Sequence, residues 1–307
     1  MFDKIIKENQ FKTKCVIAIY LLIFVLIGLL ADIVRINARS LGEGLYQLLT
    51  FAKFPLITAV LLVVAALVVC FAILNFKRIL LNGNEYKEIL QGKEANAKER
   101  ELSQILDELI VAANLPFRPK LFLMEAPFMN AFASGWEAKN SLIALTTTLV
   151  HNLSREETKA VMAHELSHIR HGDIRLTLVV GILSNIMLLV VNYGVRQFSV
   201  RNSRQKGAQM AYTLLAILQF VLPLLTLVLQ MFLSRSREYM ADSGAAYLMN
   251  DNAPMIRALQ KISGNYAQSD FSQNDNPTRT ALYIFSPKEM FSTHPSIENR
   301  IAALLQK

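Results

Sequence analysis

Charged residues are absent from four long stretches of this chain, which alternate with polar regions. The uncharged stretches are 15–31, 54–76, 176–195 and 207–234. A helix of about 20 apolar residues crosses the hydrocarbon core of a bilayer. The second stretch is therefore predicted to span a membrane, and the other three are candidates to do so. This pattern indicates an α-helical integral membrane protein with about four transmembrane segments.

Three of these stretches also allow an interpretation other than a simple membrane span. Lysines precede the first one, as in a signal peptide, but its apolar run is long and no small-residue cleavage site follows. An uncleaved anchor is therefore favoured. The third and fourth stretches contain polar residues such as Asn192 and Gln219, which need partners inside lipid. They form either a spanning hairpin, which we favour, or a buried or re-entrant pair.

Composition and charge fit a membrane protein with a sizeable water-exposed domain. Hydrophobic residues make up 53% of the 307, the mean hydropathy is +0.32 and the formal net charge is +8. Lys and Arg gather beside the apolar stretches, which indicates contact with lipid and argues against nucleic-acid binding. Only two cysteines occur, both in apolar stretches, so the sequence shows no disulfide framework and fits a reducing compartment.

The distribution of basic residues also predicts an orientation. They are concentrated before residue 15 and after residue 76, and are sparser between the first two stretches. By the positive-inside rule, the N-terminus and the polar region from residue 77 onward face the cytoplasm. The loop 196–206 has four basic and no acidic residues, so the same rule does not favour an external position for it.

The motif that carries the most chemical information is HELSH, from His164 to His168. Two histidines four residues apart lie on one face of an α-helix and can bind a single Zn²⁺, while Glu165 between them can accept a proton from water. Five such letters also arise by chance. The flanks favour a real helix, because Ser154 and Glu157 form a capping box and Gly172 is a stop signal.

A catalytic zinc ion needs a third protein ligand. Glu238 is the strongest candidate, because it stands four residues before Asp242 on an alanine-containing helix that we expect to begin just after the fourth uncharged stretch. Glu238 would bind zinc and Asp242 would support the site from behind. The alternative is a solvated helix face. His171 is a rival ligand, but its Cα would lie about 10.5 Å from that of His164 on a straight helix. His171 is interpreted instead as stabilising the helix C-terminus by partial positive charge.

Three motifs in this order resemble the HtpX family of bacterial membrane proteases. They are HELSHIRHGD at 164–173, SRSREYMAD at 234–242 and STHPSIENRI at 292–301. The resemblance covers nearly the whole chain, including its four apolar stretches. It implies an inner-membrane zinc endopeptidase with one zinc ion per chain, a cytoplasmic site and a role in stress response and quality control of damaged membrane proteins. It also supports Glu238 as the third ligand.

The resemblance gives meaning to two further segments. Residues 130–135 resemble the edge strand with which zinc peptidases hold a substrate backbone; from the sequence alone this segment is more often plain core. The candidate substrate-binding residues are Asn130, Ala131, Phe132 and Ala133. The resemblance also suggests that His294 faces the site and stabilises the tetrahedral oxyanion, and the alternative is a structural hydrogen bond at a helix entry.

We therefore expect four parts along the chain. These are an N-terminal transmembrane hairpin at 1–76, a cytoplasmic α+β zincin-like protease domain with the metal helix at 77–173, a second transmembrane or re-entrant hairpin at 174–234, and the remainder of the protease domain with the third ligand at 235–307.

The expected activity is hydrolysis of peptide bonds, with zinc held by three side chains and Glu165 as general base. One alternative is a membrane scaffold or holdase with structural zinc, against which a glutamate in the position of a base argues. Another is the prenyl-protein type of membrane zinc protease, which shares the motifs and has a larger multi-span chamber. The expected partners are protein substrates, chiefly membrane proteins, and the lipid bilayer; the sequence defines no oligomeric state.

Overall fold

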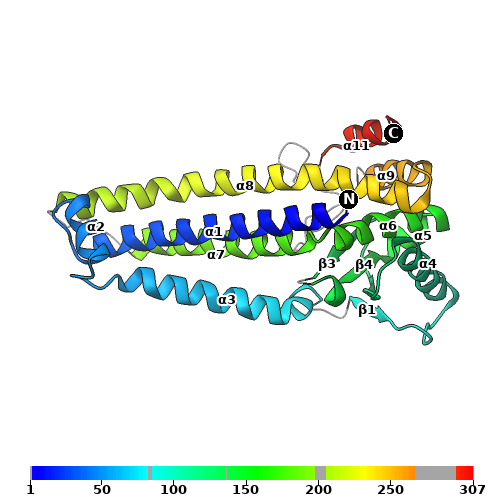
Figure 1. The fold of residues 1–307 in the computed structure, drawn as a ribbon, viewed down its shortest axis with the longest axis horizontal. Coiled ribbons are helices and arrows are strands. Elements are labelled where there is room, and N and C mark those ends of the chain that lie inside the picture. Colours follow the sequence, from blue (N-terminus) through cyan, green and yellow to red (C-terminus); the bar gives the residue numbers. More distant parts are fainter. Residues whose placement is uncertain (1, 82–84, 136, 198–204, 267–294, 307) are drawn as a thin grey trace. The chain divides into compact units, whose positions relative to one another are not determined.

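The computed structural model describes residues 2–81, 85–135, 137–197, 205–266 and 295–306 (Figure 1). The chain forms two compact units. The first consists of Met1–Phe11, Asn75–Leu178 and Gln230–Lys307, and the second of Lys12–Leu74 and Val179–Leu229. The first unit contains the β-sheet and the HELSH helix, and the second contains most of the four uncharged stretches.

All four uncharged stretches fold as helices. They lie in α1 (Phe2–Arg35), α3 (Leu56–Leu80), α7 (Ile174–Gln197) and α8 (Lys206–Met249). Within the described residues, two stretches are long and apolar enough to cross a membrane, Lys14–Arg35 and Lys206–Thr226, and the apolar parts of α3 and α7 are shorter. The prediction of apolar helical segments is confirmed, and the count of four spans stays a prediction.

The third-ligand candidate does not lie on a separate helix that begins after the fourth stretch, as we expected. Helix α8 runs unbroken for 44 residues, through Pro223 to Glu238 and Asp242. The expectation was wrong because residues 224–243 contain neither glycine nor proline, so nothing in the local sequence ends the helix there.

Polar side chains tie the helices of the second unit together. The hydroxyl of Tyr20 on α1 lies 2.6 Å from Ser184 Oγ on α7. The side-chain amide of Gln219 on α8 donates to Asn192 Oδ1 on α7 at 2.9 Å. Polar residues of the third and fourth stretches therefore bond to other helices, which lowers the cost of placing them in an apolar environment.

A buried carboxylate joins α1 to α3. Asp32 accepts hydrogen bonds from the backbone amides of Ile57 and Thr58 at 3.1 and 2.9 Å, and Arg35 pairs with it at 2.7 Å. It caps orphan amides of the first turn of α3, and a negative charge there also suits the helix dipole. The short helix α2 (Leu41–Leu49) lies in the connection between α1 and α3.

The first unit is built on a four-stranded sheet with the order β1-β2-β4-β3. Strands β2 and β4 are parallel, and the two outer pairs are antiparallel. Alternate residues on one face, including Leu121, Ala133 and Ile143, join the hydrophobic core with α4 and α6. The strands are β1 (Tyr86–Ile89), β2 (Lys120–Met124), β3 (Ala131–Ser134) and β4 (Leu142–Thr146).

Helices cover this sheet and complete the first unit. Figure 1 shows α4, α5 and α6 beside the strands, and α6 contacts both β3 and β4 as well as α4 and α9. The remaining elements are α4 (Ala97–Ala113), η1 (Ala138–Asn140), α5 (Thr147–Asn152), α6 (Arg155–His171), α9 (Ala253–Tyr266) and α11 (Ile297–Leu305). The HELSH motif therefore lies on a central helix packed on both sides.

Candidate metal centre

Helix α6 begins and ends where the sequence predicts. Ser154 is its N-cap, and Ser154 and Glu157 form the complete capping box. Lys261 of α9 adds an ion pair to Glu157 at 2.7 Å. The helix ends at Gly172, whose φ of 69° is left-handed and favours glycine. Both ends of the motif helix are fixed by local signals, which makes it a rigid support for its side chains.

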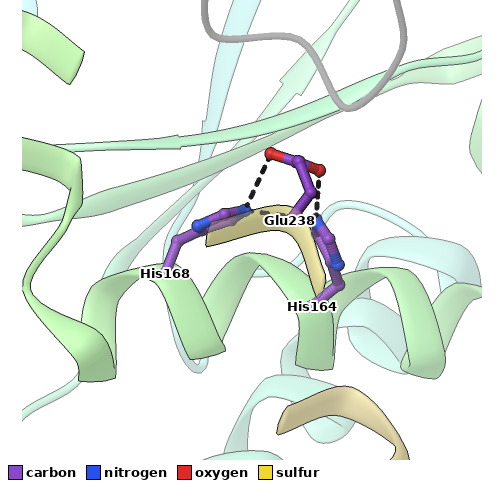
Figure 2. A group of neighbouring side chains, drawn as sticks. All are labelled: His164, His168 and Glu238. Atoms are coloured by element: carbon purple, nitrogen blue, oxygen red, sulfur yellow. Dashed lines mark hydrogen bonds and ion pairs between the residues drawn. The ribbon is translucent and has the colours of Figure 1, made fainter. Parts of the chain in front are cut away.

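The two motif histidines converge on one point. Their Nε2 atoms lie 3.2 Å apart, and their rings meet edge to face with centroids 4.8 Å apart. Figure 2 shows both rings rising from the same side of α6. His164 is fully buried, whereas the side chain of His168 is 15% exposed. His168 therefore lies on the more accessible side of the site.

Glu238 of α8 faces both imidazoles. One carboxylate oxygen lies 3.5 Å from Nε2 of His164 and the other lies 3.6 Å from Nε2 of His168 (Figure 2). One ligand atom from each of the three side chains lies within 4.8 Å of the others, and among the described residues they form a group that could hold a metal ion. The structure thus brings together the three side chains that the sequence singled out as ligands.

Carboxylates behind the histidines fix the orientation of both rings. Nδ1 of His164 lies 2.9 Å from Oδ1 of Asp242, and Nδ1 of His168 lies 3.1 Å from Oδ2 of Asp173. Each Nδ1–H donates to its carboxylate, so that in the neutral imidazole the lone pair of Nε2 is directed at the point of convergence. Two imidazole nitrogens and one carboxylate are a donor set of the kind that catalytic zinc uses, so these residues fit a divalent metal.

Asp173 is a site residue that our sequence reasoning missed. It directly follows the C-cap Gly172, and its backbone amide bonds to the carbonyl of His168 at 3.4 Å. This turn brings the carboxylate back towards the helix it has just left. The sequence signal that could have identified Asp173 is an acidic residue directly after the glycine that ends a ligand helix.

Arg300 is the second residue that was missed. Its side chain is fully buried, and it donates from Nε and Nη2 to the two oxygens of Asp242 at 2.9 and 2.7 Å. Its Nη1 also lies 3.5 Å from Oε2 of Glu238. The arginine belongs to the third motif of the resemblance, but nothing local in the sequence indicated that it enters the centre.

The charges in this centre shift one another's protonation. Burial alone would lower the pKa of His164, but hydrogen bonds to Asp242 and Glu238 outweigh it and raise this pKa to about 9. Burial raises the pKa of Glu165, against the opposing charges of the two histidines. A carboxyl group with a raised pKa is a stronger base than an exposed glutamate, which suits proton transfer.

The interpretation of His171 needs a correction. It does lie in the last turn of α6, but it is buried, and that burial lowers the pKa of its imidazole to about 4. His171 is therefore neutral at pH 7 and does not stabilise the helix end by positive charge. It also does not belong to the group of described side chains that could hold a metal ion.

The close approach of α8 to α6 depends on small residues. Ala241 and Ala245 are completely buried, as the alanine-rich pattern predicts. The tightest contact is at Gly244, where a Cβ atom would lie 2.4 Å from Oγ and 2.8 Å from Cβ of Ser167. A larger side chain there would force the two helices apart, and with them Glu238 from the histidines.

The candidate substrate strand lies at an edge of the sheet. Among the residues that the structure describes, strand β3 pairs only with β4, and the amide of Thr146 donates to the carbonyl of Asn130. By the alternation of an antiparallel ladder, the backbone groups of Ala131 and Ala133 are directed away from β4. The Ala131 amide accordingly bonds to its neighbour's side chain, Asn130 Oδ1, at 2.8 Å. His294 lies outside the described residues, and its role stays a prediction.

Comparisons with known proteins agree with this geometry. The profile of peptidase family M48 matches residues 96–307. The chain is 56% identical over 307 residues to a protease HtpX homolog of Helicobacter pylori (strain Shi470), covering 100% of this chain and 98% of the relative. It is 33% identical to a protease HtpX homolog of Ligilactobacillus salivarius (strain UCC118), covering 97% of each.

A solved structure has a similar fold. The crystal structure of S. mikatae Ste24p aligns with a TM-score of 0.53 and 20% sequence identity, over 83% of this chain and 60% of that one. At this identity the likeness concerns the fold alone.

Proposed function

Because this chain belongs to peptidase family M48, and within it to the HtpX proteases, it is a membrane-bound metalloendopeptidase, and we propose that His164, His168 and Glu238 hold its catalytic metal. We propose further that the metal is zinc, one ion per chain, and that the substrates are damaged or misfolded membrane proteins. The observation that carries the site assignment is the convergence of two Nε2 atoms and one carboxylate within 4.8 Å.

The chain's own residues supply the remaining chemistry. When bound, zinc would polarise the scissile carbonyl and lower the pKa of a water molecule towards about 7. Glu165 accepts the proton of that water on a carboxylate oxygen and then delivers it to the leaving amine. Asp242 and Asp173 keep the two imidazoles in the tautomer that presents Nε2. The buried surroundings exclude bulk water and strengthen these interactions.

Removal and return of the metal test this proposal directly. We expect the full chain, purified in detergent with a chelator, to lose cleavage of casein and to regain it with Zn²⁺ but not with Mg²⁺, which prefers all-oxygen sites. Cleavage that persists in chelator would contradict a metalloenzyme. Tight Zn²⁺ binding without any cleavage would favour the scaffold with structural zinc.

We propose that β3 binds substrate by strand addition, through the carbonyl of Ala131 and the backbone groups of Ala133, which are directed away from β4; the Ala131 amide is bonded to Asn130 Oδ1. Only alternate backbone amides of an added strand face its neighbour. A series of substrate peptides, each methylated at one amide nitrogen, should therefore show KM raised about 3- to 10-fold at every second position, the worth of one hydrogen bond. An effect that does not alternate along the peptide would contradict the binding mode.

We also propose an orientation for the chain in the membrane. It spans the membrane four times, and the basic residues place the protease domain in the cytoplasm. After replacement of both native cysteines, Lys53→Cys should react with an impermeant maleimide in intact spheroplasts and Lys93→Cys should react only after lysis. Both positions are exposed. Labelling of Lys93→Cys in intact spheroplasts, with Lys53→Cys labelled only after lysis, would overturn the orientation.

The proposal that the substrates are membrane proteins is tested by cleavage. Equal cleavage rates for soluble and membrane substrates would argue against it.

A further inference from the structure

Arg300 occupies an unusual position for an arginine. It lies on α11, its side chain has no exposed surface, and it reaches the residues behind the metal group. A buried guanidinium is costly unless it is paired with good geometry. An apolar residue of similar volume would anchor α11 without burying a charge. The charge and the shape of the side chain therefore need an explanation within the centre.

The contacts of Arg300 form a chain that leads to a proposed ligand. Oδ1 of Asp242 receives Nη2 of Arg300 at 2.7 Å and lies 2.9 Å from Nδ1 of His164. Oδ2 of the same carboxylate receives Nε of Arg300 at 2.9 Å. Both oxygens of Asp242 are thus held by a rigid two-pronged donor, which fixes the plane of the carboxylate and so the angle at which it meets the imidazole.

The charge of Arg300 also offsets two buried carboxylates. Its Nη1 lies 3.5 Å from Oε2 of Glu238, so one guanidinium faces both acidic side chains that α8 sends into the centre. Paired with this guanidinium at 2.7 Å, Asp242 is held as an acceptor for Nδ1 of His164, which lies 2.9 Å away.

We propose that Arg300 is a positioning residue that holds Asp242, and through it His164, in the geometry that binds the metal. This inference rests on the proposed metal site. Coupling of this kind is reciprocal: if docking of α11 strengthens metal binding by some factor, metal strengthens docking of α11 by the same factor. Metal binding and the anchoring of a helix far along the chain are then two readouts of one interaction.

The test measures metal affinity and helix docking in the full chain. Zn²⁺ affinity is determined by competition with a chromophoric chelator, and docking by hydrogen exchange of α11 with and without Zn²⁺. We expect Zn²⁺ to slow exchange in α11 of the unmodified protein. Arg300→Lys, which keeps the charge but loses the two-pronged geometry, should bind Zn²⁺ about 10- to 100-fold more weakly, and kcat should fall while KM changes little.

Two further variants separate positioning from mere packing. Arg257→Met is the matched control, because it removes an arginine of α9 that is 52% exposed and pairs with Glu157 at 3.6 Å, outside the centre; its Zn²⁺ affinity should not change. Asn252→Ala leaves every side chain of the centre in place and removes only the 2.7 Å bond from Asn252 to the carbonyl of Leu304, at the end of α11. It should loosen α11 and weaken Zn²⁺ binding together, and excess Zn²⁺ should restore docking.

The outcomes discriminate clearly. Unchanged Zn²⁺ affinity in Arg300→Lys, or a loosened α11 in Asn252→Ala with unchanged affinity, would overturn the positioning role and leave the proposed metal site intact. If the unmodified protein does not bind Zn²⁺, the proposed site itself is wrong, and this inference falls with it.

Discussion

Replacement of Glu165 with glutamine is expected to lower kcat about 10²- to 10⁴-fold, the usual contribution of a positioned general base, and to leave metal affinity within a few-fold of the original. Glutamine has nearly the same shape but cannot accept the proton of the attacking water. Glu165 stands outside the three-residue group that could hold the metal. It is almost fully buried, and burial raises its pKa, so its environment favours proton transfer.

The matched control is Glu156→Gln on the same helix. Its side chain is 55% exposed and pairs only loosely with Arg155, at 3.3 Å, near the N-terminus of α6. This variant should cleave casein at the rate of the unmodified protein. Zinc content and cleavage are measured on the same preparations. Substantial turnover by Glu165→Gln with zinc bound would show that another group removes the proton.

The parts of the site that could be predicted from the sequence are those fixed by local structure. The spacing of His164 and His168 places both on one helix face, and Ser154 and Gly172 determine where that helix begins and ends. Glu238 and Asp242 follow the same logic on α8. Each of these inferences depends on contacts within about one helical turn, for which sequence spacing is a reliable guide.

The parts that were missed depend on tertiary contacts. Arg300 is 58 residues from Asp242 in the chain, and no periodicity relates the two. The low pKa of His171 comes chiefly from burial, whereas its sequence position suggested only a helix end. Asp173 needed the left-handed turn at Gly172 to bring it back to His168. The parallel pairing of β2 with β4 likewise joins segments separated by another strand.

The continuity of α8 illustrates a different kind of error. Hydropathy changes at residue 234, and we therefore expected a new helix to begin there. Hydropathy reports on the surroundings of a helix, whereas helix ends are set by caps, glycine and proline, none of which ends the helix near residue 234. One continuous backbone therefore carries an apolar stretch and the third-ligand candidate.

Replacement of His164 with alanine is expected to abolish cleavage and to weaken Zn²⁺ binding on the order of 10²- to 10³-fold, about one ligand's share of the binding free energy of a zinc site. His164 supplies one of the two converging nitrogens, and its removal also leaves Asp242 and Arg300 without the imidazole they orient. The loss should therefore exceed that caused by Arg300→Lys, which weakens the same ligand only indirectly.

Two other histidines make this prediction discriminating. His151→Ala removes an exposed imidazole on α5 and should change neither zinc content nor cleavage. His171→Ala removes the rival ligand on α6; it should retain zinc, because the described group of side chains that could hold a metal ion does not include His171. Zinc content is measured after dialysis against a weak chelator. If His171→Ala lost zinc as completely as His164→Ala, the ligand set would have to be revised, since a buried neutral imidazole one turn beyond His168 would then be binding the metal.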